Sequence, residues 1–405
     1  MRRPEGGSLS DLRRTNRNAA LRLLRLYGGM TQAELSRLSG LSRASVFNIV
    51  RELAEEGSAR VTTTTRNGRR VSQVTLNPDA GIVVGVDIGN RHVRVAVADL
   101  AHRVLAEERV PLPLGHRADD AITQSVALVR RMVDEADREM KHVDCVAVGV
   151  PGPILATAGR LGAPSVLPGW AGVGVSDAFT HRLGVRAVVD NDANLGALAE
   201  SAWGRGRGVP DFAYLKVSTG IGAGLVLNGS LYRGSSGIAG EIGHTTIDED
   251  GVVCRCGNRG CLETVAAAPA LLEMLRAAYG DLTLEDLLTL STSGDIGCRR
   301  VITDAGRHIG VAVANLCNTL NPALIVVGGE LAAAGEVLLT AIRDSMARRA
   351  LSVAERTTEV VTGAFAERTA VLGAVALALQ EGDPTMEPGA SSGAETAMPG
   401  AALAV

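Results

Sequence analysis

Three cysteines and one histidine lie close together in the middle of the chain. The sequence there runs Glu241-Ile-Gly-His244 and, after nine intervening residues, Cys254-Arg-Cys256-Gly-Asn-Arg-Gly-Cys261. Thiolates and a neutral imidazole suit tetrahedral Zn²⁺, and four protein ligands leave no open position for catalysis. The spacing predicts a structural zinc site in the loop 244–261, with His244, Cys254, Cys256 and Cys261 as ligands. The alternative is a disulfide with one spare thiol, which a reducing compartment disfavours.

Two glutamates bracket this metal-binding segment. Glu241 stands three residues before His244, and Glu263 follows Cys261 by two residues. Because four ligands already fill a tetrahedral shell, the metal needs neither carboxylate. We therefore expect the zinc loop to hold both carboxylates in place for a different ligand.

With these residues the chain resembles the ROK family of sugar kinases and repressors. The resemblance covers about residues 81–380 and includes further segments in the same order, namely Asp87-Ile-Gly-Asn-Arg91, Gly149-Val-Pro-Gly-Pro153, Asp190-Asn-Asp-Ala-Asn194, Ser218-Thr-Gly-Ile-Gly-Ala-Gly224 and Val327-Gly-Gly329. The zinc segment is more specific than any of the glycine runs alone. The resemblance implies an α/β protein with the two-lobed ribonuclease H-like (actin-like ATPase) sugar-kinase fold.

The resemblance also implies a sugar site. In kinases of the family the middle aspartate of an Asn-Asp-Ala-Asn segment is the general base toward a sugar hydroxyl, which corresponds to Asp192, with Asn191 as a neighbouring hydroxyl contact. Further sugar contacts are implied at Glu241, His244 and Glu263. A carboxylate can accept a hydrogen bond from a bound hydroxyl whether or not proton transfer follows. Asn191 and Asp192 also precede a helical run at 195–203, so capping that helix is a second, compatible role.

The first of two expected phosphate-binding loops is altered. Kinases of the family carry Asp-Ile-Gly-Gly-Thr there, where the second glycine admits a phosphate and the threonine hydroxyl donates to it. Asp87 and Gly89 are kept, but Asn90 and Arg91 replace the last two residues. A guanidinium cannot replace a compact hydroxyl, although it could pair with phosphate as a cation.

The second loop is nearly intact and keeps Thr219, Gly220 and Gly222. A glycine-rich hairpin alone is weak evidence for phosphate binding, because tight turns between strands favour glycine anyway. Since one of the two loops is lost, we expect ATP not to be used.

The overall composition sets the class of protein. With 405 residues, 46% hydrophobic and 21% charged, the chain can bury a large core and should divide into two or three domains. Only 2% of the residues are aromatic, so a stacking surface for single-stranded nucleic acid is not expected. No run of 18 apolar residues occurs, and no apolar stretch follows the basic start. We expect a cytoplasmic protein without a membrane span.

The charge is divided unevenly along the chain. Residues 1–78 contain 14 Arg, no Lys and six acidic residues, a net charge of +8, whereas the remaining 27 basic and 38 acidic residues give −11. A positive module on an acidic body indicates that one end alone binds a phosphate backbone.

The helices expected in this basic module follow the helix-turn-helix pattern. Residues 16–27 have apolar positions at helical spacing and are followed by two glycines. Thr31 with Glu34 forms a capping box for a second helix, and Ser42 caps a third helix after a glycine turn.

A β-hairpin is expected to complete the module as a wing. Strands at 59–65 and 69–76 flank Asn67-Gly68, a strong hairpin signal. We expect the third helix to enter the major groove of operator DNA. Base edges are assigned to Arg43, Ser45 and Asn48, and phosphates to Arg51, Arg66, Arg69 and Arg70. The alternative is a three-helix interaction domain with an ordinary solvated, charged face.

From residue 79 the pattern alternates between strands and helices, as in an α/β body. Strands are expected at 82–87, 93–98, 143–150, 212–217, 225–227 and 324–327, and helices at 121–140, 195–203 and about 300–318, 334–349 and 369–380. We expect a winged helix-turn-helix at 1–78, a sugar-binding body of two lobes at 79–380, and a disordered tail at 381–405 that is rich in Pro, Gly, Ala and Ser.

These features favour a sugar-responsive transcriptional regulator, a repressor that acts as a homodimer or homotetramer and responds to a sugar or sugar phosphate. The first alternative is an ATP-dependent sugar kinase with a DNA-binding appendage, because Asp192 and the second loop are retained. A third hypothesis is a constitutive DNA-binding protein whose body only oligomerises.

Overall fold

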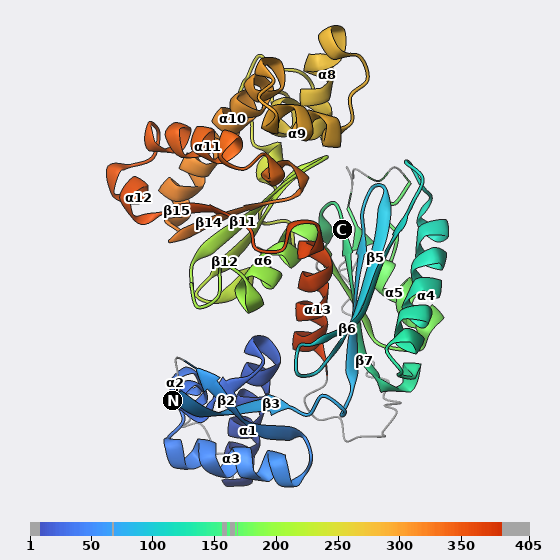
Figure 1. Ribbon diagram of the computed structural model, residues 1–405, viewed down its shortest axis with the longest axis vertical. Coiled ribbons are helices and arrows are strands. Elements are labelled where there is room, and N and C mark those ends of the chain that lie inside the picture. Colours follow the sequence, from blue (N-terminus) through green and yellow to red (C-terminus); the bar gives the residue numbers. More distant parts are fainter. Residues whose placement is uncertain (1–8, 67–68, 156–159, 163–166, 168, 383–405) are drawn as a thin grey trace, which may run out of the picture.

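The computed structural model describes residues 9–66, 69–155, 160–162, 167 and 169–382. Figure 1 shows three parts: a small module that contains the N-terminal helices, a first lobe that contains helix α4, and a second lobe that contains helices α8 to α12. The red helix α13 lies between the two lobes.

The module is a winged helix-turn-helix, as its sequence predicts. It contains helices α1 (Leu9–Tyr27), α2 (Gln32–Ser39) and α3 (Arg43–Glu55), and strands β1 (Met30–Thr31), β2 (Ala59–Arg66) and β3 (Arg69–Leu76) in the order β1-β3-β2. The predicted caps are confirmed: Thr31 and Glu34 form a reciprocal capping box, and the Ser42 side chain accepts a hydrogen bond from the backbone N–H of Ser45. The turn between β2 and β3, Asn67-Gly68, lies outside the described residues.

The first lobe contains a mixed five-stranded sheet in the order β10-β7-β4-β5-β6. Its strands are β4 (Ile82–Ile88), β5 (His92–Asp99), β6 (Val104–Pro111), β7 (Val143–Val150) and β10 (Ala187–Asn191), with the short pair β8 (Ile154–Leu155) and β9 (Arg160–Leu161) beside it. The helices of this lobe are α4 (Ala118–Glu135), α5 (Val175–Leu183), the 3₁₀ turn η1 (Met140–His142) and α13 (Thr369–Glu381). Strand β6 was not expected from the sequence, and α4 ends five residues before the expected end at Met140.

The second lobe repeats this sheet topology in the order β13-β12-β11-β14-β15. Its strands are β11 (Phe212–Val217), β12 (Ile221–Leu227), β13 (Ser230–Tyr232), β14 (Leu324–Gly328) and β15 (Glu359–Thr362). In both lobes three antiparallel strands are followed by two parallel ones. The duplication confirms the expected fold class.

Helices surround the second sheet. They are α6 (Asp192–Trp203), α7 (Glu263–Ala266), α8 (Ala268–Tyr279), α9 (Leu284–Thr292), α10 (Ile296–Leu320), α11 (Glu336–Ala347) and α12 (Ser352–Thr357), with 3₁₀ turns η2 (Ile242–His244), η3 (Glu330–Ala334) and η4 (Ala366–Arg368). Helices α8 and α9 were not expected. The described chain extends only to residue 382, so nearly all of the expected tail lies outside it.

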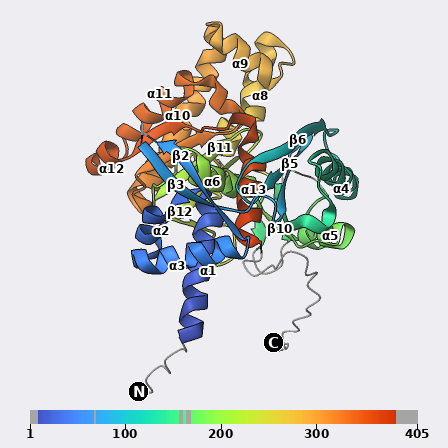
Figure 2. The same ribbon diagram turned by 60° about the horizontal axis from the view of Figure 1, so that its bottom comes forward.

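The module and the first lobe share one hydrophobic core. Leu24 of α1, Leu53 of α3 and Val74 of β3 belong to the same buried cluster as Val83 of β4 and Val375 of α13. At the edge of this core Arg25 forms a buried ion pair with Asp144, with Nη1 and Oδ2 2.8 Å apart. The N-terminal module is therefore packed against the first lobe. Figure 2 shows the module in front of the lobes.

Helices α6 and α13 form the contact between the two lobes. Helix α13 packs on β4 and β7 of the first lobe, and α6 packs on β11 and β12 of the second. The two helices approach closely, because a Cβ atom at Gly373 would lie 1.8 Å from the carbonyl oxygen of Leu195. The lobes thus meet through this tightly packed helix pair and through the ion pair of Arg233 with Asp190, and the space between them holds the site described below.

Candidate ligand cleft, metal site and DNA-binding helix

A cavity of about 630 Å³ opens between the two lobes. Its wall includes Asp87, Gly89 and His92 from the first lobe, and Asp192, Lys216 and Thr219 from the second. This volume suits a small polar ligand, since ligand pockets in proteins measure roughly 300–1,000 Å³.

The predicted general base, Asp192, is paired with a cation. It is the first residue of α6 and is buried, and the ammonium group of Lys216 on β11 donates a hydrogen bond to its carboxylate. Burial raises the pKa of Asp192, and the charge of Lys216 opposes that rise. Burial lowers the pKa of Lys216, but Asp192, and to a smaller extent Asp87 and Glu330, outweigh this effect and raise it. Lys216 therefore stays protonated among three carboxylates.

The first phosphate loop is occupied by protein side chains. Asp87 is hydrogen-bonded to His92, with Oδ2 and Nε2 3.0 Å apart. The His92 ring lies over Gly89, where an added Cβ would come within 2.4 Å of it. His116 donates from Nε2 to the carbonyl oxygen of Gly89, at 3.1 Å. The imidazole of His92 therefore occupies space beside Gly89, the glycine that was predicted to contact phosphate.

The second loop is the tight turn between β11 and β12. The Ser218 hydroxyl donates to Glu330 at 2.7 Å, and Thr219 faces the cavity. The glycines nearby serve packing: a Cβ at Gly222 would lie 3.3 Å from the Cβ of Ala193. The start of α6, with Asp192, can therefore approach β12 closely. Gly220, also assigned to phosphate, lies at the turn but not in the cavity wall.

The two predicted sugar-binding glutamates lie beside this cavity and do not form part of its wall. Glu263 accepts a hydrogen bond from the backbone N–H of Ile221 at 3.1 Å and is paired with Arg255, which does line the cavity. Burial, followed by the charges of Asp192 and Glu263, raises the pKa of Glu241 to about 7. Arg255 stands between two of the predicted metal ligands, Cys254 and Cys256, so it links the predicted zinc loop to the cleft.

Asn191 caps helix α6, which confirms the capping role. Its side-chain oxygen accepts from the N–H of Ala193, and its side-chain nitrogen donates to the carbonyl oxygen of Gly152, both at 2.8 Å. The amide thus joins the loop after β7 to the start of α6. Its role as a sugar contact stays a prediction.

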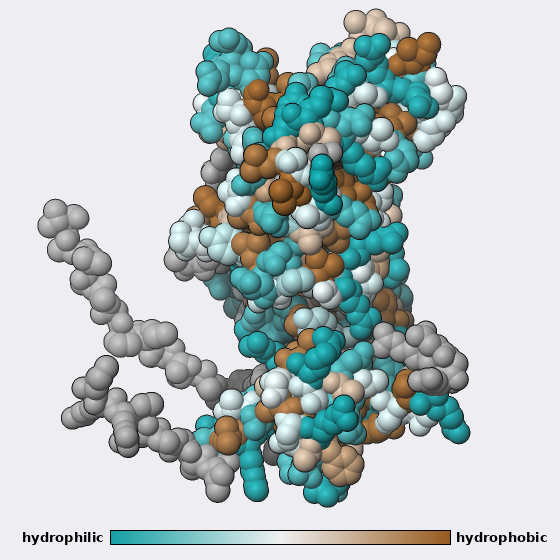
Figure 3. All heavy atoms as spheres, turned by 90° about the vertical axis from the view of Figure 1, so that its left-hand side faces the viewer, coloured by the Kyte–Doolittle hydropathy of each residue, from teal (hydrophilic) through white to brown (hydrophobic). Residues whose placement is uncertain are grey.

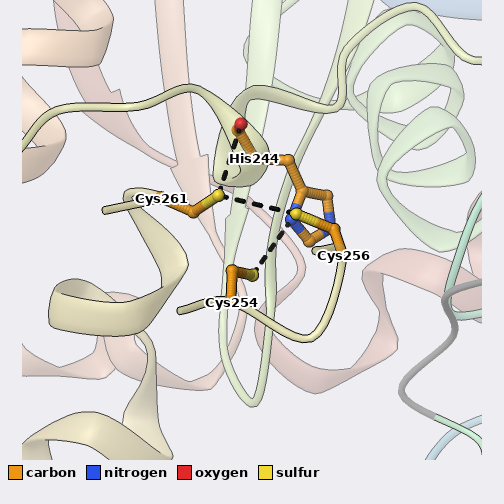
Figure 4. Close-up of side chains that lie close together, drawn as sticks. All are labelled: His244, Cys254, Cys256 and Cys261. Carbon is orange, nitrogen blue, oxygen red and sulfur yellow. Dashed lines mark hydrogen bonds between the residues drawn. The ribbon is translucent and has the colours of Figure 1, made fainter. Parts of the chain in front are cut away.

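The four predicted metal ligands converge on one point. His244, Cys254, Cys256 and Cys261 point toward one another (Figure 4), and their ligand atoms all lie within 4.8 Å of one another. Nδ1 of His244 is 3.6 Å from Sγ of Cys254, and Sγ of Cys256 is 3.6 Å from Sγ of Cys261. Tetrahedral Zn²⁺ with Zn–S bonds of about 2.3 Å requires sulfur atoms about 3.8 Å apart.

This arrangement fits a metal better than the disulfide alternative. All six cysteines are free, and the Sγ–Sγ distance is far longer than the about 2.05 Å of a disulfide. The other ring nitrogen of His244, Nε2, faces Glu241, whose Oε2 lies 4.0 Å away. The same imidazole can therefore reach both a metal and the edge of the cleft.

The predicted DNA contacts on α3 share an exposed face. Arg43, Asn48 and Arg51 are exposed, whereas Ser45 is half-buried and its hydroxyl lies 2.9 Å from that of Ser42. Arg70 of β3 is exposed. Cross-strand backbone pairing joins Arg66 to Arg69, but the positions of these two side chains lie outside the described residues.

Three cleft residues were missed by sequence reasoning. His92 begins a strand with apolar residues at alternating positions, Lys216 lies in an otherwise apolar strand, and Arg255 lies between two predicted cysteine ligands; none of the three was given a role. A signal existed for Lys216 alone: it interrupts a buried strand, and the chain contains few lysines compared with arginines.

Among the described helices, none is both long enough and apolar enough to cross a membrane.

Known protein families match both the two-lobed body and the N-terminal module. The sequence matches the ROK family over residues 83–381 and a winged helix-turn-helix DNA-binding family over residues 13–57. It is 28% identical to a xylose repressor of Caldicellulosiruptor bescii, covering 93% of this chain and 98% of the repressor. It is 31% identical to the DNA-binding transcriptional dual regulator NagC of Escherichia coli, covering 92% and 94% of the two chains.

Two solved structures differ in how much of this chain they match. A ROK family transcriptional regulator, a homologue of the E. coli MLC protein, aligns with 91% of this chain and 97% of its own, with a TM-score of 0.74 and 25% identity. A ROK family glucokinase from Streptomyces griseus, solved with glucose and AMPPNP, covers 74% of this chain and 100% of its own, with a TM-score of 0.64 and 27% identity. The regulator therefore matches this chain over a larger share of its length than the kinase does.

Proposed function

The chain belongs to the ROK family and is a DNA-binding transcriptional regulator, and we propose that it is a repressor whose operator affinity changes when a sugar or sugar phosphate binds in the cleft. We propose that it acts in the cytoplasm, where its DNA partner lies. The observation that carries this proposal is the physical connection between the cleft and the module through helix α6.

Helix α6 has one end at the cleft and the other at the module. Asp192 at its first turn lines the cavity. At its last residue the indole N–H of Trp203 donates to Nδ1 of His102, at 3.0 Å. The His102 ring in turn lies against Gly28, directly after α1, where an added Cβ would be 3.1 Å from Nδ1. A shift of α6 on ligand binding would therefore displace the second lobe relative to the junction that the module forms with the first lobe.

A sugar that bridges the lobes would produce such a shift. Asn191 is the last residue of β10 in the first lobe, whereas Asp192, Glu241 and Glu263 belong to the second lobe. Hydroxyl groups that bind both sets at once would favour a closed arrangement of the lobes, and a ligand can shift an equilibrium only by its differential affinity for the two states.

The second candidate function is sugar phosphorylation, favoured by the position of Asp192 in the cleft. Two observations weigh against it. Lys216 already pairs with Asp192, and His92 lies over Gly89 in the first phosphate loop, where Arg91 also replaces the expected hydroxyl. We expect negligible ATP-dependent turnover. A rate on the order of 1 s⁻¹ or more, abolished by Asp192→Asn, would instead support the kinase.

The donor set of the zinc loop fits a structural Zn²⁺ held by His244, Cys254, Cys256 and Cys261. When bound, such an ion cross-links the loop and adds folding free energy. The loop would then fix Arg255, and through it Glu263, at the edge of the cleft. Neither residue has to bind the metal for this positioning role.

We further propose that the protein acts as a homodimer or homotetramer. One recognition helix contacts only a few base pairs, and two-fold operators with half-sites about one or two helical turns apart allow two such helices to bind at once. Closure of the lobes in each subunit would change the spacing of the two modules and hence the fit to both half-sites.

The test is a titration of labelled operator with and without ligand. A thermal-shift screen of monosaccharides and sugar phosphates first identifies the ligand, because a ligand at a hundred times its Kd stabilises by about 2.7 kcal/mol. We expect the ligand to change operator affinity by roughly 5- to 150-fold, and operator to change ligand affinity by the same factor.

Glu263→Ala should lose this response, and Glu273→Ala, an exposed glutamate of α8, serves as its control. If ligand binds to the wild type but operator affinity stays constant, the body is not a sensor for this module. If Glu263→Ala responds like the wild type, the assignment of the sugar site is wrong.

A further inference from the structure

Phe47 lies exposed on the third helix of the module, which is an unusual place for it in this chain. Of the four phenylalanines, Phe179 and Phe212 are fully buried and Phe365 is partly buried, whereas Phe47 is 54% exposed. Single exposed apolar residues are common on protein surfaces and need no explanation by themselves. Figure 3 shows such scattered hydrophobic residues among hydrophilic ones on one face of the molecule. The inference therefore depends on what surrounds Phe47.

The ring stands on the face of α3 that is turned away from the core. The buried residues Val46, Ile49, Val50 and Leu53 form the opposite face. In an α-helix, residues three and four positions apart are neighbours, so Phe47 is flanked by Arg43 on one side and Arg51 on the other, with Ala44 and Asn48 beside it. An apolar ring thus lies within the surface assigned to DNA.

We propose that Phe47 is a specificity residue that contacts the C5-methyl group of a thymine in the major groove. This proposal rests on the proposed DNA-binding function. Among the base edges exposed in the major groove, the thymine methyl is the apolar group, and phenylalanine is one of the side chains that contact it. The flanking arginines and the net charge of +8 on residues 1–78 favour a polyanion over an apolar protein surface as the occupant of this face.

The contact would add sequence discrimination that the polar residues do not supply. Arg43 and Asn48 can form hydrogen bonds with purine edges, and phosphate contacts position the module without reading sequence. A methyl contact instead distinguishes thymine from cytosine and from uracil at one position of each half-site.

The experiment uses full-length protein and an operator selected from random double-stranded DNA, without any sugar. Each thymine of the selected site is replaced by deoxyuridine, which removes only the methyl group. Burial of one methyl predicts about a 4-fold loss of affinity for the wild type at the contacted position, and roughly 16-fold when both half-sites are changed.

Phe47→Ala should bind the thymine and deoxyuridine operators equally well, and Phe47→Leu should keep part of the preference because its side chain is still apolar. Val353→Ala, which trims an exposed apolar residue of α12, is the control and should retain the full methyl preference.

Equal sensitivity of the wild type and Phe47→Ala to every methyl replacement would overturn the proposal. So would an unchanged operator affinity of Phe47→Ala together with a loss of self-association in sedimentation, because the ring would then contact a second copy of the chain. Failure of the wild type to select any DNA sequence would contradict the proposed function itself, which separates the two outcomes.

Discussion

The first lobe meets the DNA-binding module through apolar side chains, whereas it meets the second lobe across a cleft of about 630 Å³ that contains several charged groups. At the first junction Leu24 and Val375 belong to one continuous core. At the second, Asp87, Asp192 and Lys216 surround open space, and apolar contact is concentrated in the helix pair α6 and α13, through which Leu195 and Leu198 join the same core. A close-packed apolar junction resists small displacements, and a charged cleft bridged by one helix pair allows them. The difference indicates that the module moves together with the first lobe, and that ligand acts between the lobes.

The largest expected effect is the loss of the ion pair at the apolar junction. Arg25→Ala removes the partner of Asp144, and both side chains are more than nine-tenths buried. Breaking a buried pair costs about 3–5 kcal/mol, because one charge stays buried without a partner. Urea unfolding should show this loss. Arg17 lies on the same helix as Arg25, and its ion pair with Glu56 is more exposed. Arg17→Ala should therefore cost less than about 1 kcal/mol. Similar losses for both variants would show that the junction is not rigid.

The second prediction tests whether the zinc loop supports the cleft. Wild-type protein prepared without chelator should contain about one Zn²⁺ per chain by elemental analysis, and Cys256→Ser should lose it. In Cys256→Ser the affinity for the ligand should also fall, by about 10- to 100-fold, as is typical when residues that position a site are disturbed. Cys298→Ser, a buried cysteine outside the loop, should keep the metal. Little metal in the wild type would contradict the zinc site.

The third prediction concerns the charges of the cleft and their pH dependence. In Lys216→Met the buried Asp192 loses the cation that opposes the rise of its pKa. The folded protein then holds a proton on Asp192 at pH values where the unfolded chain, with a pKa of about 3.9, has released it. Stability should therefore fall by up to about 1.4 kcal/mol for each pH unit from about pH 4 upward, and it should continue to fall at pH values where the wild type, whose Asp192 pKa is raised less, has levelled off. Urea unfolding at several pH values measures this slope, and Lys216→Met with Asp192→Asn should be flat. A flat profile for Lys216→Met itself would mean that solvent reaches Asp192.

The smallest expected effect is at the contact between α6 and the module junction. Trp203→Phe removes the N–H that donates to His102 and keeps the aromatic ring packing. Substitutions along a coupling route typically change the coupling free energy by about 0.5–2 kcal/mol. Separate affinities for ligand and for operator should stay near wild type, while their mutual effect shrinks. Trp170→Phe, which removes the N–H bond to the His116 carbonyl within the first lobe, should leave coupling unchanged.

How far the sequence could predict this molecule differs between local and long-range features. The caps at Thr31 and Ser42 and the thiol cluster depend on residues close in the sequence, and the structure confirms them. The pairing of Asp192 with Lys216 depends on how α6 lies against β11, which periodicity does not encode. The common core of the module and the first lobe could not be predicted for the same reason. The apolar faces of α1 and α13 show that each helix is buried on one side, but not which element it packs against.

The most direct test of the central claim measures two distances in one protein by pulsed electron spin resonance. Spin labels introduced through non-canonical residues, which spare the native cysteines, are placed at the exposed positions Glu52 of α3, Gln124 of α4 and Ala277 of α8. On addition of ligand, the distance between positions 124 and 277, across the cleft, should change, and the distance between positions 52 and 124, from module to first lobe, should not. A change confined to the pair 52 and 124, with the cleft distance constant, would contradict the account.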